Sequence, residues 1–194
     1  MGEIEKHLPV LLKVVEKLQS EFPDLKVIIP AANDRAYAAI TSQTSQTFQT
    51  SQTFRITRGG ARIALRDADA AIVASGTATL EAALAGCPTV LVYKVGWLFA
   101  FLARRFIKGV KHIGLANIIA EKAGAPCPMP ELLQEDFTSG NVLSRLEPWL
   151  TDSSANAKAR QALADTMRLL KSDGDAIGRI VDCLNFDTIS KLTK

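Results

Sequence analysis

The sequence predicts an α/β fold whose sheet is doubly wound and mostly parallel. Short, continuously apolar runs typical of buried parallel strands alternate along the chain with segments of helical periodicity. The chain has 194 residues, of which 47% are hydrophobic and 22% are charged, so it can bury the core of one large domain. We therefore expect residues 1–194 to form a single α/β domain.

The first part of the chain supplies a helix, a strand and a second helix. Residues 3–20 repeat apolar side chains at helical spacing, with lysine and glutamate between them. Residues 25–29 are a short apolar run that stops at Pro30, as expected of a buried strand, and residues 31–40 fit a short helix. Because the first element is a helix, the first strand of such a sheet is expected to be missing from this chain.

The middle of the chain contains two further strands, each next to a helix. A short helical segment at 61–66 is followed by an apolar strand over 67–74 and a turn of small residues at 75–79. The helix that opens there ends at Gly86, a position where glycine commonly closes a helix. Residues 89–93 are a second buried strand.

The last part of the chain is mostly helical. We expect a helix with aromatic and basic residues over 97–108 and a strand-to-helix transition over 113–120. After a proline-rich loop, Thr138 is a candidate N-cap for a helix over 138–150. One or two C-terminal helices follow over 152–184.

A six-residue polar unit is duplicated after the second helix. Residues 44–49 read TSQTFQ and residues 50–55 read TSQTFR. Two copies cannot form a solenoid, which needs at least three stacked repeats. Because alternating threonine, serine and glutamine offer little apolar surface to bury, we expect a surface loop or an edge strand over 41–55.

Composition excludes several classes of function. A formal net charge of +3 at pH 7 is too small to indicate nucleic acid as a partner. The three cysteines are far apart and form no CxxC pair, so we expect neither a disulfide framework nor a metal site, and we predict no cofactor. No apolar run reaches the ~20 residues that span a bilayer. His7 and His112 are isolated in the sequence, so we expect exposed or structural histidines there.

The clearest candidate site is the turn after the strand at 67–74. Ser75, Gly76 and Thr77 lie where the carboxyl end of a strand meets a helix N-terminus, and free backbone N–H groups there favour an anion such as a phosphate. Glu81 follows one turn into the helix, within reach of a ribose diol. The alternative is an ordinary strand-to-helix turn, with serine or threonine capping the helix and Glu81 as a first-turn acid.

Several motifs, in order along the chain, resemble one family. They are SGTATLEAALAGCPTVLVYK, WLFAFLARRFIK, GLANIIA and PELLQEDFT, and all are similar to segments of the lipid-A-disaccharide synthase family. The resemblance implies the C-terminal, Rossmann-like, UDP-sugar-binding half of a GT-B-type glycosyltransferase. The implied reaction transfers 2,3-diacylglucosamine from UDP to 2,3-diacylglucosamine 1-phosphate, which gives lipid A disaccharide 1-phosphate and UDP.

The same resemblance implies roles for particular residues. Contacts to UDP are expected from Ser75, Gly76, Thr77, Glu81 and Asn117, and a cleft between two domains is expected to contain Glu131 and Gln134. A dipolar cradle for the departing UDP would work without a metal. The family's Gly-Ser-Arg loop and N-terminal domain are absent from this sequence, and the catalytic residues are expected in that domain. We therefore expect this chain alone to bind UDP weakly and to be inactive.

A basic, aromatic segment indicates a membrane surface. Aromatic side chains insert at a lipid interface and basic ones meet anionic headgroups. The candidate membrane-facing residues are Trp97, Phe101, Arg104, Arg105 and Lys108. The alternative is a helix that packs its aromatic face into the core. The resemblance implies a cytoplasmic hexosyltransferase, peripheral on the inner membrane, with UDP-diacylglucosamine and diacylglucosamine 1-phosphate as its partners.

Two other functions stay open. Another GT-B-type transferase of the UDP-N-acetylglucosamine class would share the strand-turn-helix, although PELLQ and the ARR-containing segment are not expected beside it. A degenerate fragment would instead persist as a non-catalytic interaction module. Apolar surface exposed at the absent domain would also permit a homodimer.

Overall fold

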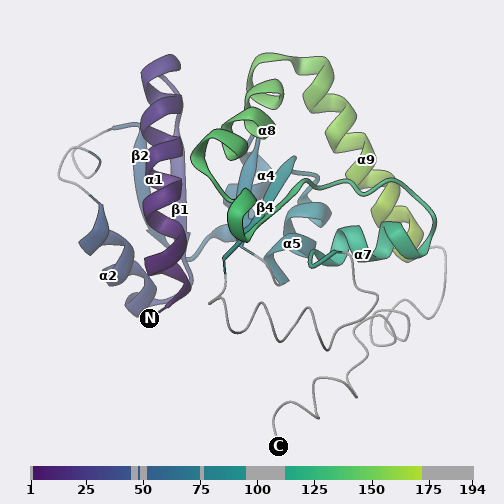
Figure 1. Cartoon of the computed structure of the whole chain (residues 1–194), viewed down its shortest axis with the longest axis horizontal. Coiled ribbons are helices and arrows are strands. Elements are labelled where there is room, and N and C mark those ends of the chain that lie inside the picture. The colour runs from purple at the N-terminus through teal and green to yellow at the C-terminus, as the bar shows by residue number, and fades with distance from the viewer. Residues whose placement is uncertain (1, 45–47, 49–51, 75–76, 95–111, 172–194) are drawn as a thin grey trace, which may run out of the picture.

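The computed structural model describes residues 2–44, 48, 52–74, 77–94 and 112–171. In this part of the chain, helices alternate with strands that pair only in parallel, which confirms the predicted α/β class (Figure 1). The strands form two sheets, a two-stranded one in the order β1-β2 and a three-stranded one in the order β3-β4-β5.

The two-stranded sheet is built from the first four elements. These are helix α1 (Glu3–Glu21), strand β1 (Val27–Ala31), helix α2 (Asp34–Gln43) and strand β2 (Phe54–Arg58). Asn33 caps α2, because its side-chain oxygen accepts a hydrogen bond from the Ala36 N–H at 2.8 Å. Leu8 and Val15 of α1 are buried in apolar clusters on this sheet, so α1 covers one of its faces.

The range 41–55, expected to form a surface loop or an edge strand, begins in a helix and ends in an edge strand. Helix α2 continues to Gln43 and strand β2 begins at Phe54. Phe48 and Phe54, one from each copy, are buried and their ring centroids lie 4.8 Å apart. Each polar unit therefore contributes one buried phenylalanine to the core.

The three-stranded sheet begins with α4 (Ala61–Asp67), β3 (Ala71–Ala74), α5 (Thr77–Ala85) and β4 (Thr89–Tyr93). The strand predicted over 67–74 is shorter than expected because α4 continues to Asp67. Strand β4 is central in this sheet, and its residues Val90, Leu91 and Val92 are at most 1% exposed. This burial on both faces explains why its sequence is continuously apolar.

The remaining elements close the sheet. They are α7 (Leu115–Lys122), β5 (Glu131–Leu133), the 3-10 turn η1 (Gln134–Asp136), α8 (Ser139–Thr151) and α9 (Ser153–Lys171). Thr138 is the N-cap of α8, as predicted, since its hydroxyl oxygen accepts from the Asn141 N–H at 3.2 Å. The helix expected over 97–108 lies outside the described residues, as does everything expected beyond residue 171.

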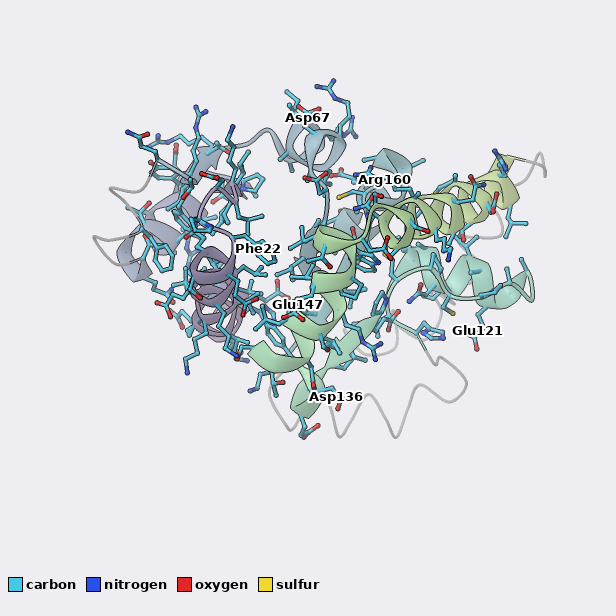
Figure 2. All side chains as sticks on the ribbon, turned by 90° about the horizontal axis from the view of Figure 1, so that it is seen from above. Phe22, Asp67, Glu121, Asp136, Glu147 and Arg160 are labelled. Carbon is cyan, nitrogen blue, oxygen red and sulfur yellow. The ribbon has the colours of Figure 1, made fainter. Side chains whose placement is uncertain are left out.

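Helices cover both faces of the three-stranded sheet, which gives it the doubly wound arrangement. Side chains from α1 and α8 form one apolar cluster with β4 and β5. A second cluster, on the other face, joins α4, α5, α7 and α9. Arg160 reaches from α9 to the ends of α4 and α5 (Figure 2), where its guanidinium donates to the Ala68 carbonyl at 2.8 Å and to the Gly86 carbonyl at 3.0 Å.

Candidate functional site

The turn predicted to bind phosphate joins β3 to α5 at the carboxyl edge of the three-stranded sheet. Strand β3 ends at Ala74 and helix α5 begins at Thr77. Ser75 and Gly76 lie outside the described residues, and Thr77 is exposed. The helix is fixed from behind, because Thr79, Ala82 and Ala83 are buried. The order of strand and helix is as the sequence predicts, but α5 begins at Thr77, so the last three residues of the turn expected over 75–79 belong to the helix.

Glu81 lies on the same side of α5 as Thr77, because residues four apart in a helix are neighbours on its surface. Its side chain is 35% exposed, and its nearest described cation is the Arg62 Nε at 3.9 Å. The Arg62 side chain is 85% exposed, so this ion pair is weak in water. The Glu81 carboxylate is therefore held loosely and can accept hydrogen bonds from a ligand.

The Asn117 side chain is fully buried, in contrast to the partly exposed Glu81 side chain. Its Nδ2 donates to the Met129 carbonyl at 2.7 Å and to the Glu131 Oε1 at 2.8 Å. Its Oδ1 accepts from the Met129 N–H at 3.0 Å. Both polar atoms of the amide are occupied inside the protein, so Asn117 fixes α7 to the segment that enters β5.

Glu131 completes this buried cluster, and its side chain is only 7% exposed. Its Oε2 accepts from the Ile113 N–H at 3.0 Å and its Oε1 accepts from the Gly114 N–H at 3.1 Å, in addition to the Asn117 amide. A buried carboxylate is tolerated where several N–H donors replace the lost water. Glu131 therefore holds the backbone that begins α7.

His112 is isolated in the sequence, but in the structure its ring contacts two other side chains. Its Nδ1 lies 3.5 Å from the Glu131 Oε1, and its Nε2 lies 3.2 Å from the Cys127 Sγ. Burial raises the pKa of the Cys127 thiol, and the carboxylates of Glu121 and Glu131 raise it further, so the thiol is protonated at neutral pH. No sequence motif signals this contact, because 15 residues separate the histidine from the cysteine.

A pocket of about 460 Å³ opens beside this cluster. Its lining residues are His112, Met129, Pro130, Glu131, Leu133, Glu135 and Asp136. Three carboxylates make the pocket unfavourable for a phosphate. Gln134 lies next to the pocket, at the start of η1. Its φ is 53°, a backbone angle that residues other than glycine rarely adopt. Within the described ranges, no group of three metal-ligating side chains is found.

The carboxyl end of β4 is anchored to the first turns of α1. The Lys94 N–H donates to the His7 Nε2 at 2.8 Å, and the Tyr93 hydroxyl donates to the Glu3 Oε1 at 2.7 Å. The His7 ring is buried between Tyr93 and Phe137, with ring centroids 5.6 and 5.5 Å away. Burial lowers the pKa of His7 from its ordinary value of 6.5, although the Glu3 carboxylate opposes this shift. His7 is therefore structural.

The residues predicted to face a membrane lie outside the described residues; they are Trp97, Phe101, Arg104, Arg105 and Lys108. Of the helices that the structure describes, none is both long and apolar enough to cross a bilayer.

The fold and the position of the α5 turn define a class of protein. Parallel strands with helices on both faces form a Rossmann-like domain, and in such domains ligands bind where helices begin at the carboxyl ends of the strands. The β3–α5 turn occupies this position.

The chain belongs to the lipid-A-disaccharide synthetase family, whose model matches residues 1–176. The lipid-A-disaccharide synthase of Acidobacterium capsulatum is 34% identical over 186 residues, which cover 92% of this chain and 45% of that protein. The synthase of Geobacter sulfurreducens is 32% identical over 173 residues, covering 89% of this chain and 43% of the relative. The synthase of Psychromonas ingrahamii is 33% identical over 186 residues, covering 95% and 47%. The chain thus spans less than half the length of these relatives.

Proposed function

We propose that this chain is the UDP-sugar-binding half of a lipid-A-disaccharide synthase. The whole enzyme would transfer 2,3-diacylglucosamine from UDP to 2,3-diacylglucosamine 1-phosphate. One observation carries the assignment of the site: an exposed hydroxyl, Thr77, and a loosely held carboxylate, Glu81, share one face of α5 directly after a turn at the carboxyl edge of the sheet. Membership of the family supplies the chemistry of the substrate.

The first turn of α5 would receive the diphosphate. Ser75, Gly76 and Thr77 would contribute N–H groups and hydroxyl donors at a helix N-terminus, where the helix dipole favours negative charge. The same donors would stabilise the charge that develops on the departing UDP, because fixed dipoles act there without reorganising. Glu81 would accept hydrogen bonds from the two ribose hydroxyls, which its carboxylate matches in number.

Asn117 and Glu131 would support the nucleotide cleft by fixing its wall. Both side chains are buried and bonded to one another, so they determine where α7 begins. Gln134 follows β5 beside the acidic pocket and would lie at the boundary with a second domain. The catalytic residues would belong to that second domain, so this chain alone would bind UDP weakly and would not turn over.

The lipid substrates also suggest where the enzyme works. Both substrates carry acyl chains that stay in a bilayer, so the enzyme would bind peripherally to the cytoplasmic face of the inner membrane. The segment that contains Trp97, Phe101, Arg104, Arg105 and Lys108 would provide the contact, with aromatic side chains in the interface and basic ones at anionic headgroups. Exposed apolar surface would in addition permit a homodimer.

Calorimetric titration of the 194-residue chain with UDP tests the proposal. Glu81→Ala should weaken UDP binding about ten-fold, the loss expected when charge-assisted hydrogen bonds are removed. Glu16→Ala is the matched control, because Glu16 is an exposed carboxylate on α1, and it should bind UDP like the parent chain. If the parent chain does not bind UDP, or if Glu81→Ala binds it equally well, the assignment of the site is wrong.

A further inference from the structure

Three side chains of the kind used in nucleophilic chemistry meet beside the loop between α7 and β5. The Cys127 Sγ lies 3.2 Å from the His112 Nε2, and the His112 Nδ1 lies 3.5 Å from the Glu131 Oε1. A thiol beside an imidazole whose other nitrogen faces a carboxylate is the arrangement that activates cysteine and serine nucleophiles. Cys127 and His112 have no part in the proposed UDP site, so this cluster needs its own explanation.

The local sequence holds the thiol in a fixed position. Cys127 stands between Pro126 and Pro128, whose rings restrict the backbone on both sides of it. Both the N–H and the carbonyl of Met129, two residues further on, are bonded to the side-chain amide of the buried Asn117. The loop is therefore fastened to α7 immediately after the cysteine, and the sulfur is kept beside the imidazole.

Glu131 determines which nitrogen of His112 can accept a proton. Its carboxylate also accepts from the Ile113 N–H at 3.0 Å, so it is fixed beside the ring. A carboxylate near Nδ1 favours the tautomer that carries its proton there, which leaves the lone pair on Nε2 for the Cys127 S–H. The Asn117 carbonyl oxygen lies 3.8 Å from the same sulfur, but a carbonyl cannot take the proton away. His112 is therefore the base of this cluster.

The charges around the sulfur select the reagents that can approach it. Cys127 is exposed, although partial burial of its sulfur raises the pKa of the thiol and the carboxylates of Glu121 and Glu131 raise it further. Glu135 and Asp136 add two carboxylates in the neighbouring pocket of about 460 Å³. A negatively charged reagent is repelled from such a surface. A thiol of raised pKa also reacts slowly unless a base takes its proton.

We propose that Cys127 is a modification site that forms mixed disulfides with small disulfides carrying no negative charge, with His112 as its general base. The His112 Nε2 accepts the thiol proton as the Cys127 Sγ attacks one sulfur of a disulfide R–S–S–R. The S–S bond of the reagent breaks as the new S–S bond to Cys127 forms, and the departing sulfur takes the proton from His112 and leaves as R–SH. The Cys127 sulfur is oxidised and the departing sulfur is reduced, so the disulfide is the oxidant. This proposal is independent of UDP binding.

The rate of reaction with cystamine, a small cationic disulfide, tests the proposal. Mass spectrometry of peptides from the acid-quenched chain measures the adduct separately at Cys127, Cys87 and Cys183. The reference is the free peptide of residues 123–130, which has the same cysteine between the same prolines but no histidine. At neutral pH, Cys127 in the 194-residue chain should react at least about ten-fold faster than the peptide. A thiol of raised pKa without a base would instead react more slowly than the peptide.

His112→Gln is the matched variant, because glutamine keeps a polar side chain but cannot take the proton. Its Cys127 should react more slowly than the peptide. Cys87 is fully buried, so its failure to react shows that the variant is folded. If the variant unfolds, the comparison of the parent chain with the peptide still decides. The anionic disulfide dithiodipropionate should gain less over the peptide than cystamine does, because the carboxylates near Cys127 repel it.

Three results would overturn the proposal. They are a reaction at Cys127 of the parent chain that is no faster than that of the peptide, equal rates in the parent chain and in folded His112→Gln, and an equal gain for cystamine and dithiodipropionate.

Discussion

The turn into α5 and the cluster that begins α7 each place a carboxylate near the start of a helix, but the two carboxylates are used in opposite ways. Glu131 is 7% exposed, and its two carboxylate oxygens accept hydrogen bonds from two backbone N–H groups and the Asn117 side-chain amide. Both oxygens are therefore already used within the protein. Glu81 is 35% exposed, and its ion-pair partner among the described residues is Arg62, which is 85% exposed. The difference separates a carboxylate that positions backbone from one that is available to a ligand.

The largest expected difference between the two carboxylates is the loss of protein stability when each is replaced by alanine. Glu131→Ala leaves the Ile113 N–H, the Gly114 N–H and the Asn117 amide without their acceptor, and should lower the free energy of unfolding by about 3 kcal/mol. Glu81→Ala should change it by less than about 1 kcal/mol. Urea denaturation of the two variants measures both values. Equal losses would show that the structural contrast between the two carboxylates is wrong.

The close packing at the start of α7 should give the next largest effect. A Cβ on Gly114 would lie 2.7 Å from the Leu91 Cδ1 and 3.2 Å from the Glu131 Oε1. Leu91 is fully buried and cannot move aside, so Gly114→Ala should destabilise the fold by about 2 kcal/mol. Gly140→Ala is the matched control, because a Cβ at Gly140 meets nothing within 4 Å, and thermal unfolding should show no loss for it. Similar melting temperatures for the two variants would contradict this packing.

The sequence predicts an element correctly where the interactions that form it lie within a few residues of one another, and fails where they join distant parts of the chain. The strand over 89–93 and the N-cap at Thr138 were predicted correctly, because continuous burial and capping leave a signal within a few residues. Strand β2 was not separated from its polar surroundings, since only packing against α1 and Phe48 explains it. Strand β5 has three residues and begins with a charge, so no periodicity could reveal it.

The candidate site shows the same limit. Thr77 and Glu81 are four residues apart on one helix, so their common face follows from helical geometry. The bonds of Asn117 to Met129 and Glu131 link residues 12 and 14 positions apart, and nothing in the sequence states that both side chains turn inward. The roles of Asn117 and Glu131 at a ligand cleft therefore stay predictions, in which the two side chains support the wall of the cleft.

A smaller effect is expected from His7, which anchors the end of β4. Burial lowers the pKa of His7 in the folded state, so the unfolded chain binds the proton more readily. The stability that neutral His7 contributes is complete above its ordinary pKa of about 6.5 and is lost as the pH falls through the lower folded value. His7→Gln keeps an acceptor for the Lys94 N–H and does not titrate, so its free energy of unfolding should vary less with pH below 6.5. Identical pH profiles would exclude this role for His7.

Amide chemical shifts measured during a UDP titration compare the two regions in one experiment. The account predicts that the Thr77 and Ala78 amides at the start of α5 shift as UDP binds, while the Ile113 and Gly114 amides, which Glu131 holds, keep their positions. Uridine, which lacks the diphosphate, should leave Thr77 and Ala78 nearly unchanged. Shifts confined to Ile113 and Gly114, or equal shifts with uridine, would contradict a diphosphate site at the α5 turn.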